Sequence, residues 1–425
     1  MKRINLTEDW TATIISGLVI LIGVVLFSSL EYVPGWPTVK WSNGNELFSD
    51  VFSGKSLRDF LFIFIVSYGV LLLASFLQGK SAGTIKGFPV LFILTALAMI
   101  IGGNKTINDW GLEAVIFCLL TGLVINNFLG VPNWLKGCLS SELYVKTGLV
   151  FLGGTIIFQD IMKAGALGLI QSVVVVFTVW YFSFWLCKKF RVDKEMSMIL
   201  SSAVSICGVS AAIATAGAIR GDSKKLSYAV SLVLVVAVPM IIIMPALAKL
   251  MGLGEAMAGA WIGGTIDTTG AVVATGALYG EEALKISSIV KFSQNVLLGI
   301  AAFLIAVYWS YTKKEGNEYA DKPSLKVIWE RFPKFVLGFI AASLLFSFIL
   351  PTAEYKPLID TVLKKFQGLW FALGFTSIGL ETNFRTLINT ENRKATFVFL
   401  GAQTFNVVFT LLIAYLVFGI QWGEV

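Results

Sequence analysis

The chain has 425 residues, of which 56% are hydrophobic and only 14% are charged; its mean hydropathy is +0.80 and its net charge is +7. A soluble domain usually carries about a quarter charged residues, so this composition, with apolar runs recurring along the whole length, predicts an all-α polytopic membrane protein. The sequence contains no histidine, which excludes a histidine metal ligand, a Ser-His or Cys-His nucleophile pair and a histidine proton relay. The four cysteines have no CxxC spacing, so neither a zinc site nor a disulfide framework is expected.

Eleven segments are predicted to cross the membrane completely. In chain order they are 11–30, 58–78, 89–103, 110–129, 144–160, 164–187, 227–250, 284–311, 335–350, 368–384 and 395–420. Lys2 and Arg3 precede the first span, and a cluster of Lys and Arg at 188–194 follows the sixth. The positive-inside rule therefore predicts a cytoplasmic N-terminus, and most of the positive charge sets topology rather than binding nucleic acid.

Two further segments, 196–219 and 256–280, have glycines and hydroxyls where the neighbouring spans have bulky aliphatic residues. We expect both to be interrupted or re-entrant helices. If each crossed the membrane fully, the chain would have thirteen spans. The cations at 220–225 directly after the first segment favour re-entry, because a full crossing would leave them outside.

A weak internal similarity links 148–158 with 368–378, two glycine-rich stretches that run in opposite directions in the predicted topology. Inverted repeats of this kind are typical of transporters. We therefore expect residues 1–104 to form N-terminal scaffold helices and residues 105–425 to form a transporter core with inverted repeats.

Interrupted helices expose backbone N–H groups that attract anions and carbonyls that bind cations. The candidate binding residues come from the two interrupted segments and the span after them. They are Ser205, Cys207, Gly208, Ser210, Thr265, Asp267, Thr268, Thr269, Lys291, Gln294 and Asn295. The alternative is structural, since hydroxyls and glycines also serve helix packing, and Gln294 and Asn295 can simply join helices.

Asp267 is the only carboxylate between Glu255 and Glu281, and a carboxylate at membrane depth usually faces a cavity or a partner. It can bind Na⁺ or H⁺, or it can neutralise Lys291 in a buried pair that only holds two helices together. No nucleotide motif, metal cluster or nucleophile triad is found, so we expect neither an enzyme nor a cofactor.

The stretches Ser205-Ile-Cys-Gly-Val-Ser-Ala-Ala-Ile-Ala and Asp267-Thr-Thr-Gly-Ala-Val-Val-Ala-Thr-Gly resemble the YeiH / UPF0324 family of bacterial membrane proteins, often labelled sulfate exporters. That family is similar to the cation/proton antiporter and bile-acid transporter superfamily. The resemblance implies an inverted-repeat fold with a mobile core and a scaffold or dimerisation domain. Family members often carry a histidine before the acidic residue of the second motif; Ile266 stands there in this chain, which suggests different ion coupling.

We therefore expect a secondary active transporter of a small anion, sulfate-like or organic, in the inner membrane of a bacterium. Its expected partners are the anion, an H⁺ or Na⁺ coupling ion, the lipid bilayer and a second copy of the chain. The first alternative is a Na⁺/H⁺ antiporter-like exchanger that uses Asp267. A channel or a membrane sensor is the alternative from another class.

Overall fold

The computed structural model describes residues 5–80, 85–109, 112–312, 324–350, 354–384 and 393–420, so Lys2 and Arg3 lie outside it. Within these ranges the chain forms helices and no strand apart from one isolated bridge between Trp41 and Asn104. The prediction of an all-α polytopic membrane protein is confirmed.

Six described helices are long and apolar enough to cross a membrane. They are α1 (Glu8–Leu30), α3 (Gly54–Leu77), α9 (Phe158–Lys189), α12 (Ser223–Leu250), α15 (Glu281–Thr312) and α20 (Arg393–Ala414) with its π-helical extension η8 (Tyr415–Gly419). The other five predicted spans are shorter helices. The prediction for 144–160 was wrong at its end, because α8 (Ser141–Gly153) stops at Gly153 and α9 already begins at Phe158.

The chain divides into two compact units, residues 1–160 with 334–382 and residues 161–333 with 383–425. This grouping differs from the expected boundary after residue 104, and the roles of scaffold and core remain predictions. Besides α1, α3 and α8, the first unit contains α2 (Gly44–Glu46), η1 (Leu47–Val51), α4 (Phe88–Gly102), α5 (Lys105–Asp109), α6 (Ala114–Val124), η3 (Ile125–Leu129), α7 (Asn133–Lys136), α17 (Lys334–Leu344), η4 (Leu345–Ile349), α18 (Lys356–Leu358), η5 (Ile359–Leu363) and α19 (Lys364–Glu381).

Glycines allow the helices of the first unit to approach closely. A Cβ on Gly122 of α6 would meet the backbone of α19, and a Cβ on Gly379 of α19 would meet the backbone of α6. Small residues provide this close packing when lipid offers no hydrophobic drive between helices. The two similar stretches, in α8 and α19, are antiparallel neighbours, since Gly148 contacts Phe371 and Gly374 contacts Val145. Their predicted opposite directions agree with this packing.

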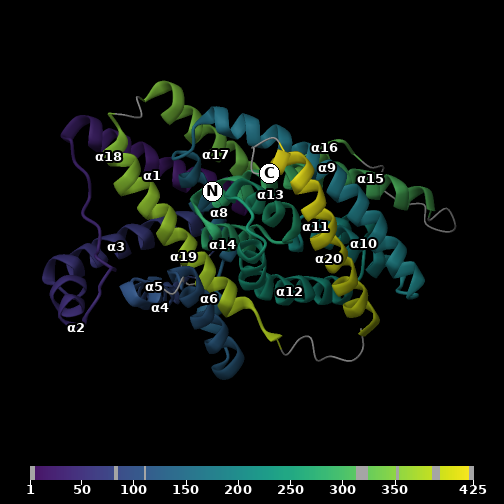
Figure 1. The fold of residues 1–425 in the computed structure, drawn as a ribbon, viewed down its shortest axis with the longest axis horizontal. Coiled ribbons are helices and arrows are strands. Elements are labelled where there is room, and N and C mark those ends of the chain that lie inside the picture. The colour runs from purple at the N-terminus through teal and green to yellow at the C-terminus, as the bar shows by residue number, and fades with distance from the viewer. Residues whose placement is uncertain are drawn as a thin grey trace. The chain divides into compact units, whose positions relative to one another are not determined.

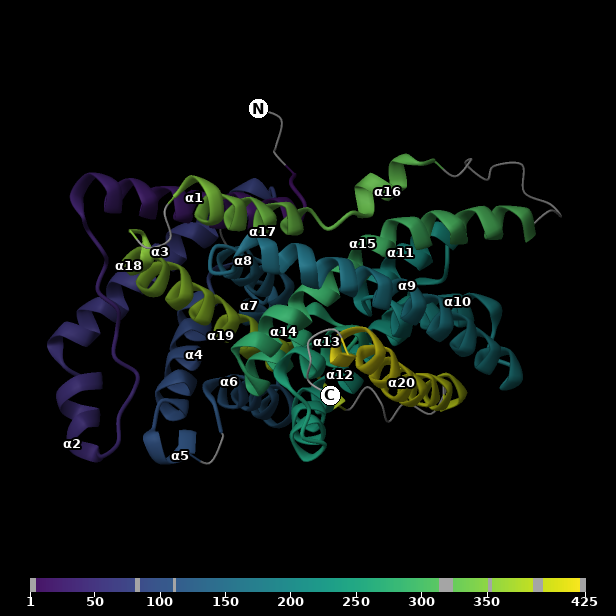
Figure 2. The same ribbon diagram turned by 45° about the horizontal axis from the view of Figure 1, so that its top comes forward.

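The second unit contains α9, α12, α15 and α20 together with α10 (Lys194–Ser205), α11 (Val209–Ile219), α13 (Glu255–Thr265), α14 (Thr269–Tyr279) and α16 (Lys326–Arg331). Within this unit, α10 and α11 lie toward one end and α13 and α14 toward the other (Figures 1 and 2). A pair of short helices followed by a long one thus occurs twice in succession, as α10–α11–α12 and as α13–α14–α15. The long helix α15 returns to the start of the first pair, where Lys194 Nζ lies 5.1 Å from the ring centre of Trp309.

The close contact in the first unit can be tested at Gly379. Gly379→Ala is expected to lower the free energy of unfolding by about 1–3 kcal/mol, because the added methyl group would meet the α6 backbone. Gly368→Ala in the same helix is the control: nothing lies within 4 Å of its Cβ position, so the change should be neutral or stabilising by up to about 1 kcal/mol. Thermal unfolding in detergent measures both, and equal midpoints would contradict the packing.

Candidate functional site

The first interrupted segment is a pair of short helices, α10 and α11, separated by Ile206, Cys207 and Gly208. Gly208 has φ of +59°, a backbone conformation that favours glycine, and it precedes the first residue of α11. The interruption is located at this glycine, whose positive φ is not compatible with a continuous right-handed helix.

The two ends of this segment lie together. Lys225 Nζ, at the start of α12, is 2.8 Å from Asp193 Oδ1 and 3.2 Å from Glu195 Oε2 at the start of α10. A segment that crossed the bilayer would separate its ends by about 30 Å. The segment therefore enters and returns on one side, as the cations that follow it favoured.

The second interrupted segment, α13 and α14, also turns back. The Glu255 carboxylate, at the start of α13, accepts hydrogen bonds from the backbone N–H groups of Glu282 at 2.8 Å and Ala283 at 3.3 Å, at the start of α15. Tyr279 Oη, at the end of α14, donates to the Leu253 carbonyl just before α13. Because the 28-residue α12 separates the two hairpins, they enter from opposite ends of that helix.

The tips of the two hairpins meet. A methyl group on Gly208 would lie 3.2 Å from Asp267 Cβ and 2.7 Å from Val233 Cγ1 of α12, so only glycine fits between the tips. Asp267 is 2% exposed and lies in the interruption of the second hairpin, between α13 and α14. The structure thus brings the two sequence-predicted segments together at one place.

Lys291 of α15 joins the two tips through their backbone carbonyls. Its Nζ donates to the Ile206 carbonyl at 2.7 Å, the Ile266 carbonyl at 2.9 Å and the Gln294 Oε1 at 2.8 Å. The side chain is 1% exposed. These three oxygens match the three N–H bonds of an ammonium group, so Lys291 is a link between the last carbonyls of α10 and α13, and its charge also acts on Asp267.

Neutral side-chain amides donate hydrogen bonds to the carbonyls next to those that accept from Lys291. Gln294 Nε2 donates to the carbonyls of Ser205 at 3.0 Å and Gly264 at 3.3 Å. From α20, Asn406 Nδ2 donates to Val204 and Thr265 carbonyls at 3.2 and 3.0 Å. Gln403 Nε2 from the same helix also reaches the Thr265 carbonyl, at 3.0 Å. The last three carbonyls at each tip, 204–206 and 264–266, therefore all accept a side-chain hydrogen bond.

Gln403 and Asn406 were missed by the sequence analysis. Both are buried polar residues, 4% and 1% exposed, in an otherwise apolar span. Buried amides in a membrane helix usually have a partner, so their polarity was the available signal.

At each tip, backbone N–H groups are found at the start of the second helix of the pair. The first N–H groups of a helix have no carbonyl partner within it, and those of α11 and α14 start directly after the two interruptions. At α14, Thr268 Oγ1 accepts from the Ala271 N–H at 3.3 Å, and Asn295 Nδ2 donates to Thr269 Oγ1 at 3.2 Å. Three buried oxygens here have no hydrogen-bond partner among the described residues: Thr265 Oγ1, Asp267 Oδ2 and Asn295 Oδ1.

Not every predicted residue presents its side chain to the tips. The Ser205 hydroxyl donates to the Ser201 carbonyl within its own helix at 2.7 Å, which is the structural alternative for this residue. Cys207 is 6% exposed and packs with apolar residues that include Ile206 and Ala211. Ser210 lies in the first turn of α11 and is partly exposed.

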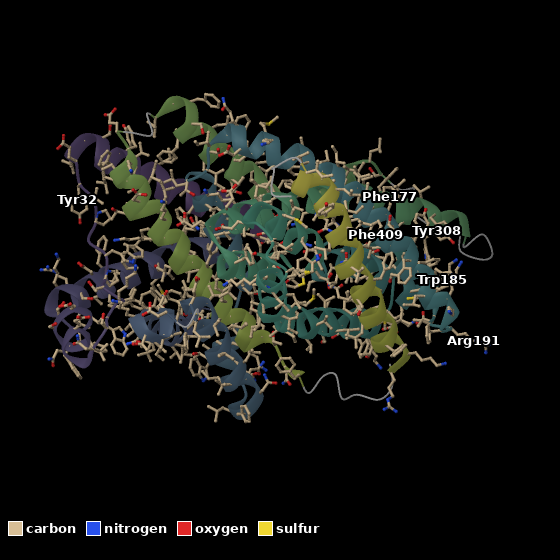
Figure 3. The ribbon with its side chains drawn as sticks, viewed as in Figure 1. Tyr32, Phe177, Trp185, Arg191, Tyr308 and Phe409 are labelled. Carbon is tan, nitrogen blue, oxygen red and sulfur yellow. The ribbon has the colours of Figure 1, made fainter. Side chains whose placement is uncertain are left out.

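An apolar cavity of about 280 Å³ reaches the first tip at Ile206. Its wall includes Phe177 of α9 and Tyr308 of α15, which are labelled in Figure 3. A wall of this kind offers no charge to an inorganic ion. The buried amides and charged groups that contact the tip carbonyls do not line this cavity.

The comparisons with known proteins agree with the resemblance noted in the sequence. Residues 86–398 match a family described as conserved hypothetical protein 698. The chain is 38% identical over 399 residues to a UPF0324 membrane protein of Rhodopirellula baltica, an alignment that covers 91% of this chain and 72% of the relative. The chain belongs to the UPF0324 family of membrane proteins.

Two further UPF0324 relatives match most of the chain. One, from Nitratidesulfovibrio vulgaris, is 40% identical over 350 residues, covering 80% of this chain and 60% of the relative. Another, from Nitrosomonas europaea, is 30% identical over 448 residues, covering 90% and 89%. No solved structure matches the chain.

The re-entrant topology can be tested with single cysteines, because the four native cysteines are buried. Lys189→Cys and Lys224→Cys are exposed positions near the ends of the first hairpin, and Met251→Cys and Glu281→Cys are exposed positions near the ends of the second. A membrane-impermeant maleimide added to intact cells is expected to label one pair and not the other. Labelling that splits either pair would show that its segment crosses the membrane.

The tip contact can be tested at Gly208. Gly208→Ala is expected to lower the free energy of unfolding by several kcal/mol, because it adds a positive-φ penalty of about 1–2 kcal/mol to an overpacking cost of about 1–3 kcal/mol. Gly252→Ala is the control, since Gly252 has φ of +66° and nothing within 4 Å of its Cβ position. If both variants lose the same stability in thermal unfolding, the tips do not touch at Gly208.

Proposed function

We propose that the chain is a secondary active transporter that moves a small anion by alternating access. The observation that carries this proposal is the meeting of two re-entrant hairpin tips. Side chains of α15 and α20 bind the tip carbonyls, whereas no side chain caps the N-terminus of α11 and only the Thr268 hydroxyl caps that of α14. Helix N-termini attract anions through their N–H groups and dipoles. Discontinuous helices with such ends form the binding sites of many transporters near the middle of the membrane.

The binding groups proposed for the anion are the N–H groups at the starts of α11 and α14 with the hydroxyls beside them. Lys291 supplies positive charge from behind the tips, but its three N–H donors already face protein oxygens, so it does not bind the anion directly. A sulfate-like or small organic anion fits these groups. The site is proposed to transport and not to catalyse.

Asp267 is proposed to carry a proton in exchange with the anion cycle. When Asp267 is ionised, its charge and that of Lys291 sum to zero; protonation of Asp267 leaves a net positive charge that favours an anion. The partnerless Asp267 Oδ2 also supports a second candidate, a Na⁺/H⁺ antiporter-like exchanger that needs no anion. A channel or sensor has no comparable observation in its favour.

The expected surroundings follow from the same proposal. They are the bacterial inner membrane with a cytoplasmic N-terminus, since the basic residues at 188–194 and 220–225 flank one side of the first hairpin. A homodimer is proposed as the assembly, because the resemblance implies a scaffold or dimerisation domain.

The pH dependence of anion flux into proteoliposomes tests this function. Wild-type flux is expected to rise as the pH falls through the titration of Asp267, because protonation removes the negative charge at the tips. Asp267→Asn is expected to flatten that pH dependence and to leave binding of the anion, followed as a thermal shift at two pH values, in place.

Glu195→Gln is a matched control at the hairpin end, far from the tips, and should keep the wild-type pH profile. Two outcomes contradict the proposal. One is an Asp267→Asn variant with the wild-type profile; the other is flux that proceeds at full rate with no anion present, which favours the antiporter.

A further inference from the structure

The six carbonyls at the hairpin tips form a partly negative region in the interior of the unit. The C-terminal end of each half-helix carries a partial negative charge, and an unsatisfied carbonyl at membrane depth costs several kcal/mol. In transporters with interrupted helices, such carbonyls coordinate the coupling Na⁺ or H⁺. Here each of the six accepts a hydrogen bond from a side chain of α15 or α20.

Only one of the four donors is charged. Gln294, Gln403 and Asn406 are neutral amides, whereas the Lys291 ammonium contacts three oxygens within 2.7–2.9 Å. Two of these are the final carbonyls of the two half-helices, at Ile206 and Ile266. The ammonium thus places one positive charge between the carbonyl ends of the two hairpins, where a free cation would otherwise be attracted.

We propose that Lys291 is a tethered cation that occupies the place of a coupling metal ion. Its four-carbon side chain is anchored in α15 and buried, so the charge cannot leave with the substrate. The consequence for transport rests on the proposed function. Transport then needs no Na⁺, and the charge exchanged at the tips is the proton of Asp267. Among the described residues, the titratable group whose charge acts on Asp267 is Lys291.

The test is to remove the tether and offer a free cation. Lys291→Ala is expected to lower the thermal midpoint in detergent by roughly 5 °C or more in choline chloride, because the carbonyls lose their cation. Sodium chloride or methylammonium chloride at the same ionic strength should restore at least about half of that loss by mass action. Choline is too large to enter and serves as the reference salt.

Two variants locate the effect. Asn406→Ala removes hydrogen bonds to carbonyls of the same two hairpins without removing a charge, and it leaves the Val204 carbonyl uncovered, so its midpoint should not depend on which cation is present. Lys291→Ala combined with Asp267→Asn should keep the recovery by Na⁺ or methylammonium. A recovery that needs Asp267 would place the cation at the carboxylate and overturn the proposal.

The wild-type protein gives a measurement that does not depend on the variants folding. Its midpoint is expected to be the same in sodium and choline chloride, and a Na⁺-specific rise would overturn the proposal. These stability measurements require no substrate or flux. Failure of the transporter function would therefore leave their outcome unchanged, and failure here would leave anion transport to be judged by its own test.

Discussion

The arrangement of the second unit depends on the hydrogen bonds from Lys291 to the Ile206 and Ile266 carbonyls. Each interrupted helix frees backbone groups in a place where water cannot satisfy them, and such groups must find partners within the protein. One ammonium group serves both interruptions, so it fixes the first tip relative to the second. The hairpins themselves are closed at their other ends by Lys225 and by Glu255. The contacts at the tips and at the other ends together hold each pair of short helices in one arrangement.

The hydrogen bonding of the backbone groups at the two tips is asymmetric. Side chains cover the carbonyl ends, while the N–H ends of α11 and α14 are left beside hydroxyls and three partnerless oxygens. The proposed anion transport rests on the N–H ends, whereas the partnerless Asp267 Oδ2 is the observation that supports the alternative proposal, a cation exchanger. The asymmetry also separates two roles that a Lys–Asp pair would combine, because Lys291 is held by backbone oxygens and Asp267 retains an oxygen that can exchange a proton.

The sequence alone located both hairpins and named Asp267, Lys291, Gln294 and Asn295, because polar residues in apolar segments are conspicuous. It left re-entry against crossing open, since the deciding contacts join Lys225 to Asp193 and Glu255 to Glu282. It missed Gln403 and Asn406, whose partners lie 138 to 202 residues away, a separation that no local pattern encodes. It also assigned the Ser205 hydroxyl to the site, although an ordinary bond to Ser201 satisfies it within the helix.

The hydrogen bonds from Gln403 and Asn406 of α20 to the tip carbonyls have a consequence for how the protein is made. Each half-helix has only 11 or 12 residues, about 17 Å of helix and too short to enter the membrane as an independent span. The first hairpin leaves the ribosome long before Asn406, which lies 202 residues after Val204 and supplies the partner of its carbonyl. During synthesis α15 can bind the Ser205 and Ile206 carbonyls first, whereas the Val204 carbonyl lacks its partner until α20 is made, so completion of the hairpin tips is a late step.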